Sequence, residues 1–275
     1  MKIYHLFLFC TIFIGTTLSA SPATQAAMLA DDVYLSQQQF IAKYENPAYE
    51  LIPAKALSIK YYLFSQKEQL VIVFEGTKDM SGLQTDLTIN EVQFLSEKGS
   101  LVHNGYFSEA LSARFFLSPY LNKNKKIIIT GHSLGGAVAH LLAAILYREG
   151  YAVNLYTFGE PPVGNERFVE SIKGLSHERY THVFDLIPML KKEYVVKMKA
   201  ALSYLNRQLP ENEMFYDLVA SIDGISYAYV HQGEHHYIYN LGSLPAGYDE
   251  SPWYKQMVTR VQLYHSSKNY FEGVQ

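Results

Sequence analysis

A serine bracketed by glycines is the strongest chemical signal in this 275-residue chain. Ser133 lies between Gly131 and Gly135 in the spacing G-x-S-x-G, after an isoleucine-rich run and before an apolar helical pattern. The pattern predicts a strand, a strained turn that carries the serine, and a helix, with the glycines leaving room for strand and helix to approach. Because this helix would point its N-terminus at Ser133, its free N–H groups would favour an oxyanion there. The sequence therefore predicts acyl-transfer chemistry with Ser133 as the nucleophile.

The elements that would position this serine alternate between buried strands and helices. Apolar runs predict strands over residues 69–74, 127–130, 152–159 and 179–185, and residues 36–43 have a helical pattern. Such alternation predicts an α/β fold with a mainly parallel central sheet flanked by helices. Functional groups in such sheets gather at the carboxyl ends of strands, which is where Thr77, Ser133 and Asp185 lie.

The pattern changes between residues 191 and 227, where two helical stretches flank Pro210. An apolar stripe with lysines at other positions favours a helical insertion packed on the core. The alternative is a mobile lid whose apolar face meets lipid, which would imply transient contact with a membrane or lipid interface.

The composition and the N-terminal segment limit which classes of protein this chain can belong to. A hydrophobic content of 48% is enough for one large domain, predicted over residues 21–275, and a net charge of −3 argues against nucleic acid as a partner. Residues 1–20 read as a secretory signal peptide, with Ser19, Ala20 and Ala26 as candidate cleavage sites. A transmembrane anchor is the weaker alternative, because the apolar run is too short to span a bilayer. The signal peptide predicts that the mature protein is secreted or periplasmic. Because the one cysteine, Cys10, lies in this signal, the mature protein is predicted to have no disulfides and no thiolate metal sites.

Several blocks in order resemble the class 3 (fungal-type) lipases of the α/β-hydrolase superfamily. They run from the strand that ends in Glu75-Gly76-Thr77, through the elbow around Ser133, to the C-terminal region near Phe271. The intervening blocks are Asp86-Leu87, 102–107, 156–165 and 185–188. Glu75 and Pro162 replace two arginines of the family pattern, and loop 78–85 lacks the bulky apolar anchor of many family lids. The resemblance implies the α/β-hydrolase fold and a Ser-Asp-His triad.

The resemblance also implies the partners of Ser133. Asp185, at a strand end, matches the family's acid, in preference to the alternatives Asp86, Asp217, Asp223 and Asp249. His265 matches the C-terminal histidine that serves as general base, and His231, in a Y-x-H-x-G-x-E block, is the alternative. The backbone N–H of Leu134 and the N–H of Thr77, with its hydroxyl, are expected to form the oxyanion hole.

The remaining histidines are predicted to be structural. His132 and His103 are expected to lie in the core or to support a nearby loop. The group His231, Glu234, His235 and His236 imitates a metal site but lacks a second ligand group at zinc spacing, so no metal and no cofactor are expected.

The resemblance implies a secreted serine carboxylic-ester hydrolase that acts on lipid esters, specifically an acylglycerol lipase. The first alternative is a phospholipase A1 or lysophospholipase, because the same triad serves both kinds of enzyme. The second is a catalytically silent α/β-hydrolase scaffold that binds lipid or a partner protein. The oligomeric state is not predicted by the sequence.

Overall fold

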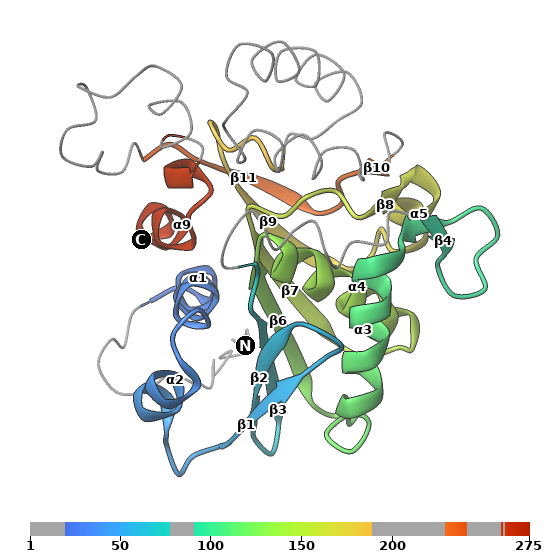
Figure 1. Ribbon diagram of the computed structural model, residues 1–275. Helices are drawn as coiled ribbons and strands as arrows, with labels where there is room; N and C mark the ends of the chain where they lie inside the picture. Colours follow the sequence, from blue (N-terminus) through green and yellow to red (C-terminus); the bar gives the residue numbers. More distant parts are fainter. Residues whose placement is uncertain (1–19, 78–90, 189–228, 241–259, 261) are drawn as a thin grey trace, which may run out of the picture.

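The computed structural model describes residues 20–77, 91–188, 229–240, 260 and 262–275 (Figure 1). Several sequence predictions fall outside these residues: nearly all of the signal peptide, loop 78–85, the insertion 191–227, Asp86, Asp217, Asp223 and Asp249.

A mainly parallel sheet forms the centre of the described structure. Its seven strands, in spatial order, are β1 (Glu50–Lys55), β2 (Lys60–Ser65), β3 (Gln69–Phe74), β6 (Lys126–His132), β7 (Val153–Phe158), β9 (Ser176–His182) and β11 (Glu234–Ile238). The two strands β1 and β2 are antiparallel, and the strands from β3 to β11 are parallel to one another. The predicted fold class is therefore confirmed.

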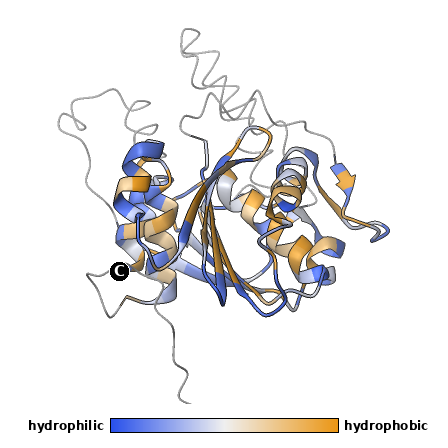
Figure 2. Ribbon diagram, turned by 90° about the horizontal axis from the view of Figure 1, so that it is seen from below, coloured by the Kyte–Doolittle hydropathy of each residue, from blue (hydrophilic) through white to orange (hydrophobic). Residues whose placement is uncertain are grey.

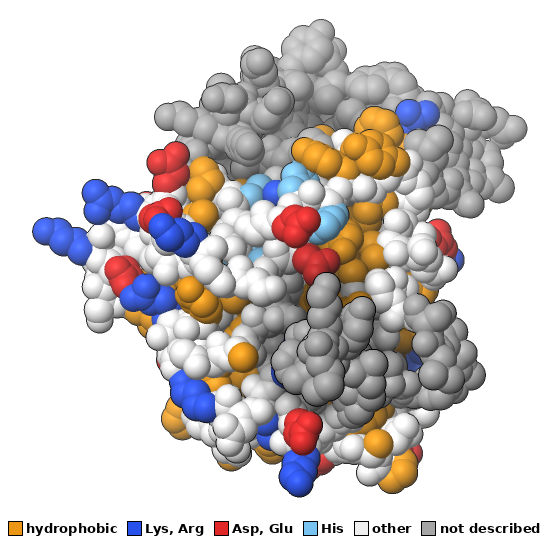
Figure 3. Space-filling model, turned by 180° about the vertical axis from the view of Figure 1, so that it is seen from behind, with side chains coloured by type: hydrophobic (Ala, Val, Ile, Leu, Met, Phe, Trp, Pro, Cys, Tyr) orange, Lys and Arg blue, Asp and Glu red, His pale blue; other side chains and the backbone are white. Residues whose placement is uncertain are grey.

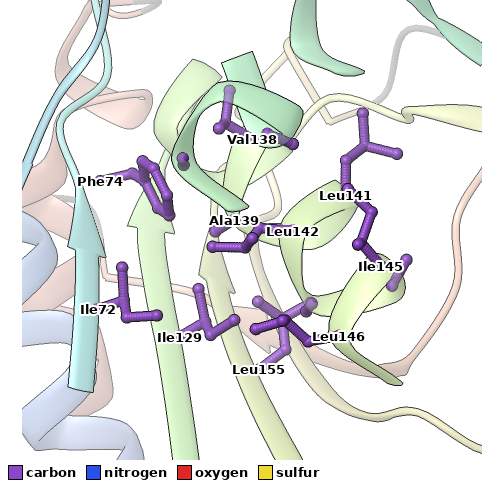
Figure 4. Packing of buried hydrophobic residues seen from close by; sticks show 14 of the residues in the cluster. Ile72, Phe74, Ile129, Val138, Ala139, Leu141, Leu142, Ile145, Leu146 and Leu155 are labelled. Carbon is purple, nitrogen blue, oxygen red and sulfur yellow. The ribbon is translucent and has the colours of Figure 1, made fainter. Parts of the chain in front are cut away.

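The middle of the sheet forms where the sequence is most apolar. Strands β3, β6 and β7 consist largely of β-branched and aromatic residues that favour a pleated, buried surface. Helix α4 (Leu134–Arg148) is buried from Leu134 to Leu146 and packs across these strands. In Figure 4, Leu142 and Leu146 of α4 point toward Ile129 of β6 and Leu155 of β7. This packing anchors the helix that starts directly after Ser133.

Helices cover both faces of the sheet. Helix α3 (Asn104–Leu117) packs against α4 on one face. Helices α1 (Pro22–Asp32), α2 (Gln37–Tyr44) and α9 (Ser267–Val274) lie on the other side of the sheet (Figure 1). The hydrophobic sides of these helices face the sheet, as the orange colouring between the layers shows (Figure 2).

A smaller antiparallel sheet lies beside the main one. Its strands are, in order, β10 (Tyr229–Val230), β8 (Gly164–Asn165), β5 (Leu101–His103) and β4 (Glu91–Gln93), and α5 (Glu166–Ser171) follows β8. Asn165 caps α5, because its side-chain oxygen accepts the N–H of Phe168 at 3.0 Å.

Both ends of one strand differ from the prediction by three residues. We expected a strand over 179–185, whereas β9 runs from Ser176 to His182. The chain turns after His182, and the N–H of Asp185 donates to the carbonyl oxygen of His182 at 3.0 Å. The turn lifts Asp185 out of the sheet, so the carboxylate is carried by a loop rather than by the strand itself. No helix in the described part of the chain is long and apolar enough to cross a membrane.

Candidate active site

Ser133 lies on the turn between β6 and α4, with the backbone angles φ 55° and ψ −128°. A positive φ is uncommon and strained for a residue with a side chain. The turn persists because β6 pairs with strands on both sides and α4 is buried along most of its length. The predicted strand–turn–helix around Ser133 is therefore confirmed.

The two flanking glycines are required by close backbone contacts. A Cβ atom on Gly131 would lie 2.5 Å from the carbonyl carbon and oxygen of Gly135, so a side chain there would collide with the helix. A Cβ atom on Gly135 would lie 2.6 Å from the carbonyl oxygen of Phe74 and 2.8 Å from the carbonyl carbon of Glu75. The elbow is thus packed directly against the end of β3.

The structure brings Ser133, His265 and Asp185 into hydrogen-bond contact. His265 Nδ1 lies 2.7 Å from Asp185 Oδ2, and His265 Nε2 lies 2.7 Å from Ser133 Oγ. Because a carboxylate only accepts, Nδ1–H donates to Asp185 and Nε2 is left to accept the O–H of Ser133. Asp185 is fully buried, whereas the imidazole of His265 keeps 11% of its surface exposed. This is the geometry of a serine nucleophile, a base and an orienting carboxylate.

Asp185 is held by two donors besides His265. The N–H of Ile187 donates to Oδ1 at 2.9 Å, and the phenol of Tyr270 donates to Oδ2 at 2.7 Å. The phenol oxygen in turn accepts the N–H of His182 at 2.9 Å. Burial and the neighbouring carboxylate raise the pKa of Tyr270 well above its ordinary value, so the phenol stays protonated and remains a donor.

His132 is a neutral, buried neighbour of His265. Its ring centroid is 4.8 Å from that of His265, and its Nδ1 lies 2.9 Å from the hydroxyl of Tyr34. Burial, followed by the nearby imidazole of His265, holds the pKa of His132 well below its ordinary value. His132 therefore packs against the imidazole of His265 without adding a positive charge.

The alternative base, His231, is engaged elsewhere. Its Nε2–H donates to the carbonyl oxygen of Pro188 at 2.7 Å. Burial, followed by the charge of Arg179, lowers the pKa of His231 to about 3. His103 caps α3, because its Nδ1 accepts the N–H of Tyr106 at 3.4 Å, and burial lowers its pKa to about 4. His103 is structural, as expected.

The two residues expected to form the oxyanion hole lie at the start of α4 and just after β3. Leu134 is the first residue of α4, so its N–H belongs to the open N-terminus of that helix. Thr77 is half-buried and follows β3, whose last carbonyl groups contact Gly135. The N-terminus of α4 thus faces the chain that leads into Thr77.

The histidines and the acid considered for a metal site lie mostly at the surface. Glu234, His235 and His236 belong to the edge strand β11, and His236 Nε2 lies 3.9 Å from Glu178 Oε2. On the face drawn in Figure 3, histidine side chains lie beside acidic ones at the surface. A different group, His140, Glu160 and His177, is buried and closely packed.

Sequence reasoning did not find this buried group or the supporting tyrosines. The three residues of the group are 20 and 17 positions apart and belong to different elements, and the sequence carries no spacing signal for them. Tyr34 and Tyr270 are two of the chain's 23 tyrosines, and only the fold shows which ones reach the site.

Comparison with curated proteins finds partial matches. The chain is 30% identical over 151 residues to Toxin TseL of Vibrio cholerae, a match that covers 53% of this chain and 23% of the toxin. It is 30% identical over 132 residues to secreted mono- and diacylglycerol lipase 1 of Fusarium solani, covering 45% of this chain and 40% of that protein. It is 32% identical over 137 residues to a lipase of Rhizomucor miehei, a match that covers 45% of this chain and 38% of that lipase. The chain thus spans less than half the length of these relatives.

Solved structures share the fold over a larger part of the chain. The Rhizomucor miehei lipase in complex with its propeptide has a TM-score of 0.56 and 21% identity, with 79% of this chain and 68% of that chain covered. A triacylglycerol lipase whose catalytic centre is formed by a serine protease triad has a TM-score of 0.57 and 18% identity. This match covers 90% of this chain and 91% of that chain.

The family match covers the elements that carry Thr77, Ser133 and Asp185. Residues 71–195 match the family described as lipase (class 3). This segment begins within β3, includes the elbow and ends after the Asp185 turn. Over this segment the chain is similar to class 3 lipases, and it shares the fold of their solved structures.

Proposed function

We propose that this chain is a secreted serine carboxylic-ester hydrolase that acts on lipid esters, specifically on acylglycerols. The observation that carries the proposal is the pair of 2.7 Å contacts that His265 makes, through Nε2 with Ser133 and through Nδ1 with Asp185. Each of the three side chains has one role in ester hydrolysis, and no metal is needed for that chemistry.

In the first half-reaction, Ser133 Oγ attacks the ester carbonyl carbon while its proton moves to His265 Nε2. The carbonyl C–O double bond becomes a single bond, and the negative charge collects on that oxygen. When the intermediate collapses, the bond to the leaving alcohol breaks and His265 gives its proton to that alcohol. An acyl group is left on Ser133.

In the second half-reaction, water takes the place of the alcohol. His265 accepts a proton from water, the resulting hydroxide attacks the acyl carbon, and the proton returns to Ser133 as the fatty acid leaves. Asp185 holds Nδ1–H throughout and stabilises the imidazolium that forms in each half. The N–H groups of Leu134 and Thr77 stabilise the oxyanion in both halves.

The relatives support the substrate class and the secretion. The Fusarium solani relative is named as a secreted mono- and diacylglycerol lipase, and the Rhizomucor miehei relative as a lipase. The apolar run in residues 1–20 supports export through a signal peptide.

Hydrolysis of defined esters tests the proposal. The protein expressed from Ser21 onward is assayed with p-nitrophenyl esters of short and long acyl chains, and then with mono-, di- and triacylglycerols and phosphatidylcholine. We expect acylglycerols to be cleaved faster than the phospholipid, and Ser133→Ala to abolish both cleavage and labelling by a fluorophosphonate probe.

Two other outcomes would replace the proposal. Faster cleavage of phosphatidylcholine would make the protein a phospholipase. A folded protein that neither hydrolyses any of these esters nor reacts with the probe would be a silent scaffold.

A further inference from the structure

A compact group of three ligand-type side chains, none of which belongs to the Ser133–His265–Asp185 site, lies in the interior. His140 belongs to α4, Glu160 follows β7, and His177 belongs to β9. All three side chains are almost completely buried, and one ligand atom from each lies within 4.8 Å of those of the other two.

The carboxylate of Glu160 lies between the two imidazoles. Its Oε1 is 2.6 Å from His140 Nδ1, and its Oε2 is 3.4 Å from His177 Nε2. The ring centroids of the two histidines are only 4.7 Å apart. The two imidazoles and the carboxylate therefore converge on one small volume.

Two atoms of this group are buried without a hydrogen bond. Glu160 Oε2 and His140 Nε2 have no hydrogen-bond partner among the residues that the structure describes. A buried carboxylate is costly unless its charge is balanced and its oxygens are satisfied. The group therefore has two buried atoms that are free to act as ligands, and its carboxylate favours a positive charge beside it.

His177 is already oriented as a ligand. Its Nδ1 lies 2.8 Å from Gln232 Oε1, and the amide of Gln232 is fixed because its Nε2 donates to the carbonyl oxygen of Leu175 at 3.1 Å. Since Gln232 Oε1 only accepts, Nδ1 carries the proton, and Nε2 keeps its lone pair at 2.8 Å from the hydroxyl of Thr157 and 3.4 Å from Glu160 Oε2. Metal-binding histidines are held in this way, with the second ring nitrogen donating to a fixed acceptor.

We propose that His140, Glu160 and His177 bind a zinc ion that stabilises the fold. Two imidazole nitrogens and one carboxylate oxygen are a ligand set that Zn²⁺ favours. The hydroxyl of Thr157, 2.8 Å from His177 Nε2, or a water molecule would complete four-coordination.

Such an ion would connect the three elements on which the active site depends. It would link the helix that begins after Ser133, the loop after β7 and the strand that leads to Asp185. The loop is already close to the triad, because a Cβ atom on Gly159 would lie 3.1 Å from Asp185 Oδ2. The ion takes no part in the ester chemistry, so this inference does not depend on the proposed function.

A metal-free arrangement is the competing account. Arg179 is buried and interacts electrostatically with Glu160, and a proton on either imidazole would add further positive charge. In that account the group is an internal ion network that needs no metal. The two accounts differ in whether the purified protein contains an ion.

Metal analysis of untagged protein separates the two accounts. We expect about one equivalent of zinc per chain after dialysis against metal-free buffer. Removal of the zinc with dipicolinate should lower Tm, and adding Zn²⁺ back should restore it. Addition of Co²⁺ to the stripped wild-type protein should give the visible absorption of a four-coordinate site, a readout that does not depend on a variant folding.

Matched variants locate the site. His140→Gln and His177→Gln should lose the zinc, and Gln232→Ala should weaken binding by about 10- to 100-fold because the support for His177 is lost. His236→Gln, which changes a partly exposed histidine on β11, should retain it. The proposal is overturned if the wild-type protein neither contains zinc nor takes up Co²⁺, or if His236→Gln abolishes binding while His140→Gln does not.

Discussion

At the scale of single residues, the candidate site depends on how completely its one buried carboxylate is satisfied. Asp185 accepts hydrogen bonds from His265, Ile187 and Tyr270, and the side chain is fully buried. In such an environment hydrogen bonds to a charged group are strong, and a missing donor leaves the charge less well stabilised. The donors that surround Asp185 should therefore affect turnover although they do not touch substrate.

Tyr270→Phe tests this positioning role. The variant removes the donor to Asp185 Oδ2 and the acceptor of the His182 N–H but keeps the ring. We expect kcat to fall about tenfold with KM nearly unchanged, since a hydrogen bond to a charged group contributes about 1.5 to 3 kcal/mol. Tyr180→Phe is the matched control, because Tyr180 donates to Glu178 away from the triad. A fall in kcat that Tyr180→Phe reproduces would deny Tyr270 a specific role.

Thr77→Val tests the proposed oxyanion donors. The variant removes the hydroxyl and keeps the backbone N–H and a similar shape. If the hydroxyl stabilises the oxyanion, kcat should fall by about 10²- to 10³-fold with little change in KM. Initial rates with a soluble ester over a range of concentrations give both constants. An unchanged kcat would show that the hydroxyl of Thr77 does not contribute, and would leave only its N–H as a candidate.

His103→Asn tests how buried histidines limit stability in acid. Burial lowers the pKa of His103 to about 4 from a model-peptide value of 6.5, so between these values the unfolded chain binds a proton that the folded protein does not. Stability should therefore fall as the pH drops from 6.5 toward 4, by up to about 3 kcal/mol from this residue. Asn keeps a helix-capping side chain but does not titrate. The variant should therefore lack the part of the acid-induced loss of stability that comes from His103.

Urea unfolding at pH 7 and pH 4.5 measures the effect. The difference between the two free energies of unfolding should be smaller for His103→Asn than for the wild type. His236→Asn, a change at a partly exposed histidine, serves as the control. Equal pH dependence in wild type and His103→Asn would mean that His103 is protonated in the folded protein.

At the scale of elements, the elbow depends on close contacts between backbone atoms, which a change of side-chain rotamer cannot relieve. Gly135→Ala would place a Cβ atom 2.6 Å from the carbonyl oxygen of Phe74, and neither backbone can move without disturbing the sheet. We expect a loss of about 3 kcal/mol or more in stability, together with loss of activity. Gly136→Ala is a matched neighbour, because its nearest contact would be 3.1 Å and alanine favours the helix by about 1 kcal/mol. Thermal unfolding of both variants compares the two positions, and equal Tm values would argue against the steric account.

The same scale shows why some elements were predictable and others were not. Strands β3, β6 and β7 were predicted because buried parallel strands appear as short, continuous apolar runs. The end of β9 was placed three residues too late, because its polar and apolar residues alternate into the turn that carries Asp185. Helix α1 was not predicted, because its alanine-rich sequence follows directly on the apolar run of the expected signal peptide.

Within the site, local motifs were predictable and tertiary contacts were not. Ser133 was predicted from its flanking glycines, and the resemblance implied Asp185 and His265. The choice between His265 and His231 could not be made from the sequence, because it depends on which imidazole reaches Ser133 in the folded chain. No local spacing indicates the buried group of His140, Glu160 and His177, because these three side chains meet only in the folded chain.

At the scale of the whole molecule, the two ends of the described chain close the same face of the sheet. Helices α1 and α9 pack against each other, and the two are joined by a hydrogen bond of 2.7 Å from Ser267 Oγ to Asp31 Oδ1. Alanines of α1 pack in one apolar cluster with Phe158 of β7 and Tyr270 of α9. Because Tyr270 donates to Asp185, the N-terminal helix indirectly supports the triad. The family match, which ends at residue 195, contains neither of these two helices.

This arrangement bears on where the expected signal peptide is cleaved. Cleavage after Ala26 would remove Ser21, which caps α1 by accepting the N–H of Thr24, and the first turn that follows it. It would also remove Ala26 itself, whose carbonyl oxygen accepts the hydroxyl of Thr130 in the core, and would leave a charged N-terminus at the buried Ala27. Cleavage at Ser19 or Ala20 leaves α1 whole. We therefore expect mass spectrometry of the exported protein to show an N-terminus no later than Ser21.

Two shortened proteins test the structural reason for that expectation. A protein that starts at Ser21 should unfold as one cooperative unit, and one that starts at Ala27 should be less stable by about 2 kcal/mol or more, since it loses a helix cap and buried alanine side chains. For a chain of this size that corresponds to a Tm lower by roughly 5 °C. The shorter protein should also lose part of its kcat, because α1 packs against the helix that carries Tyr270. If both proteins have the same Tm and kcat, α1 does not support the site, and cleavage after Ala26 becomes acceptable on structural grounds.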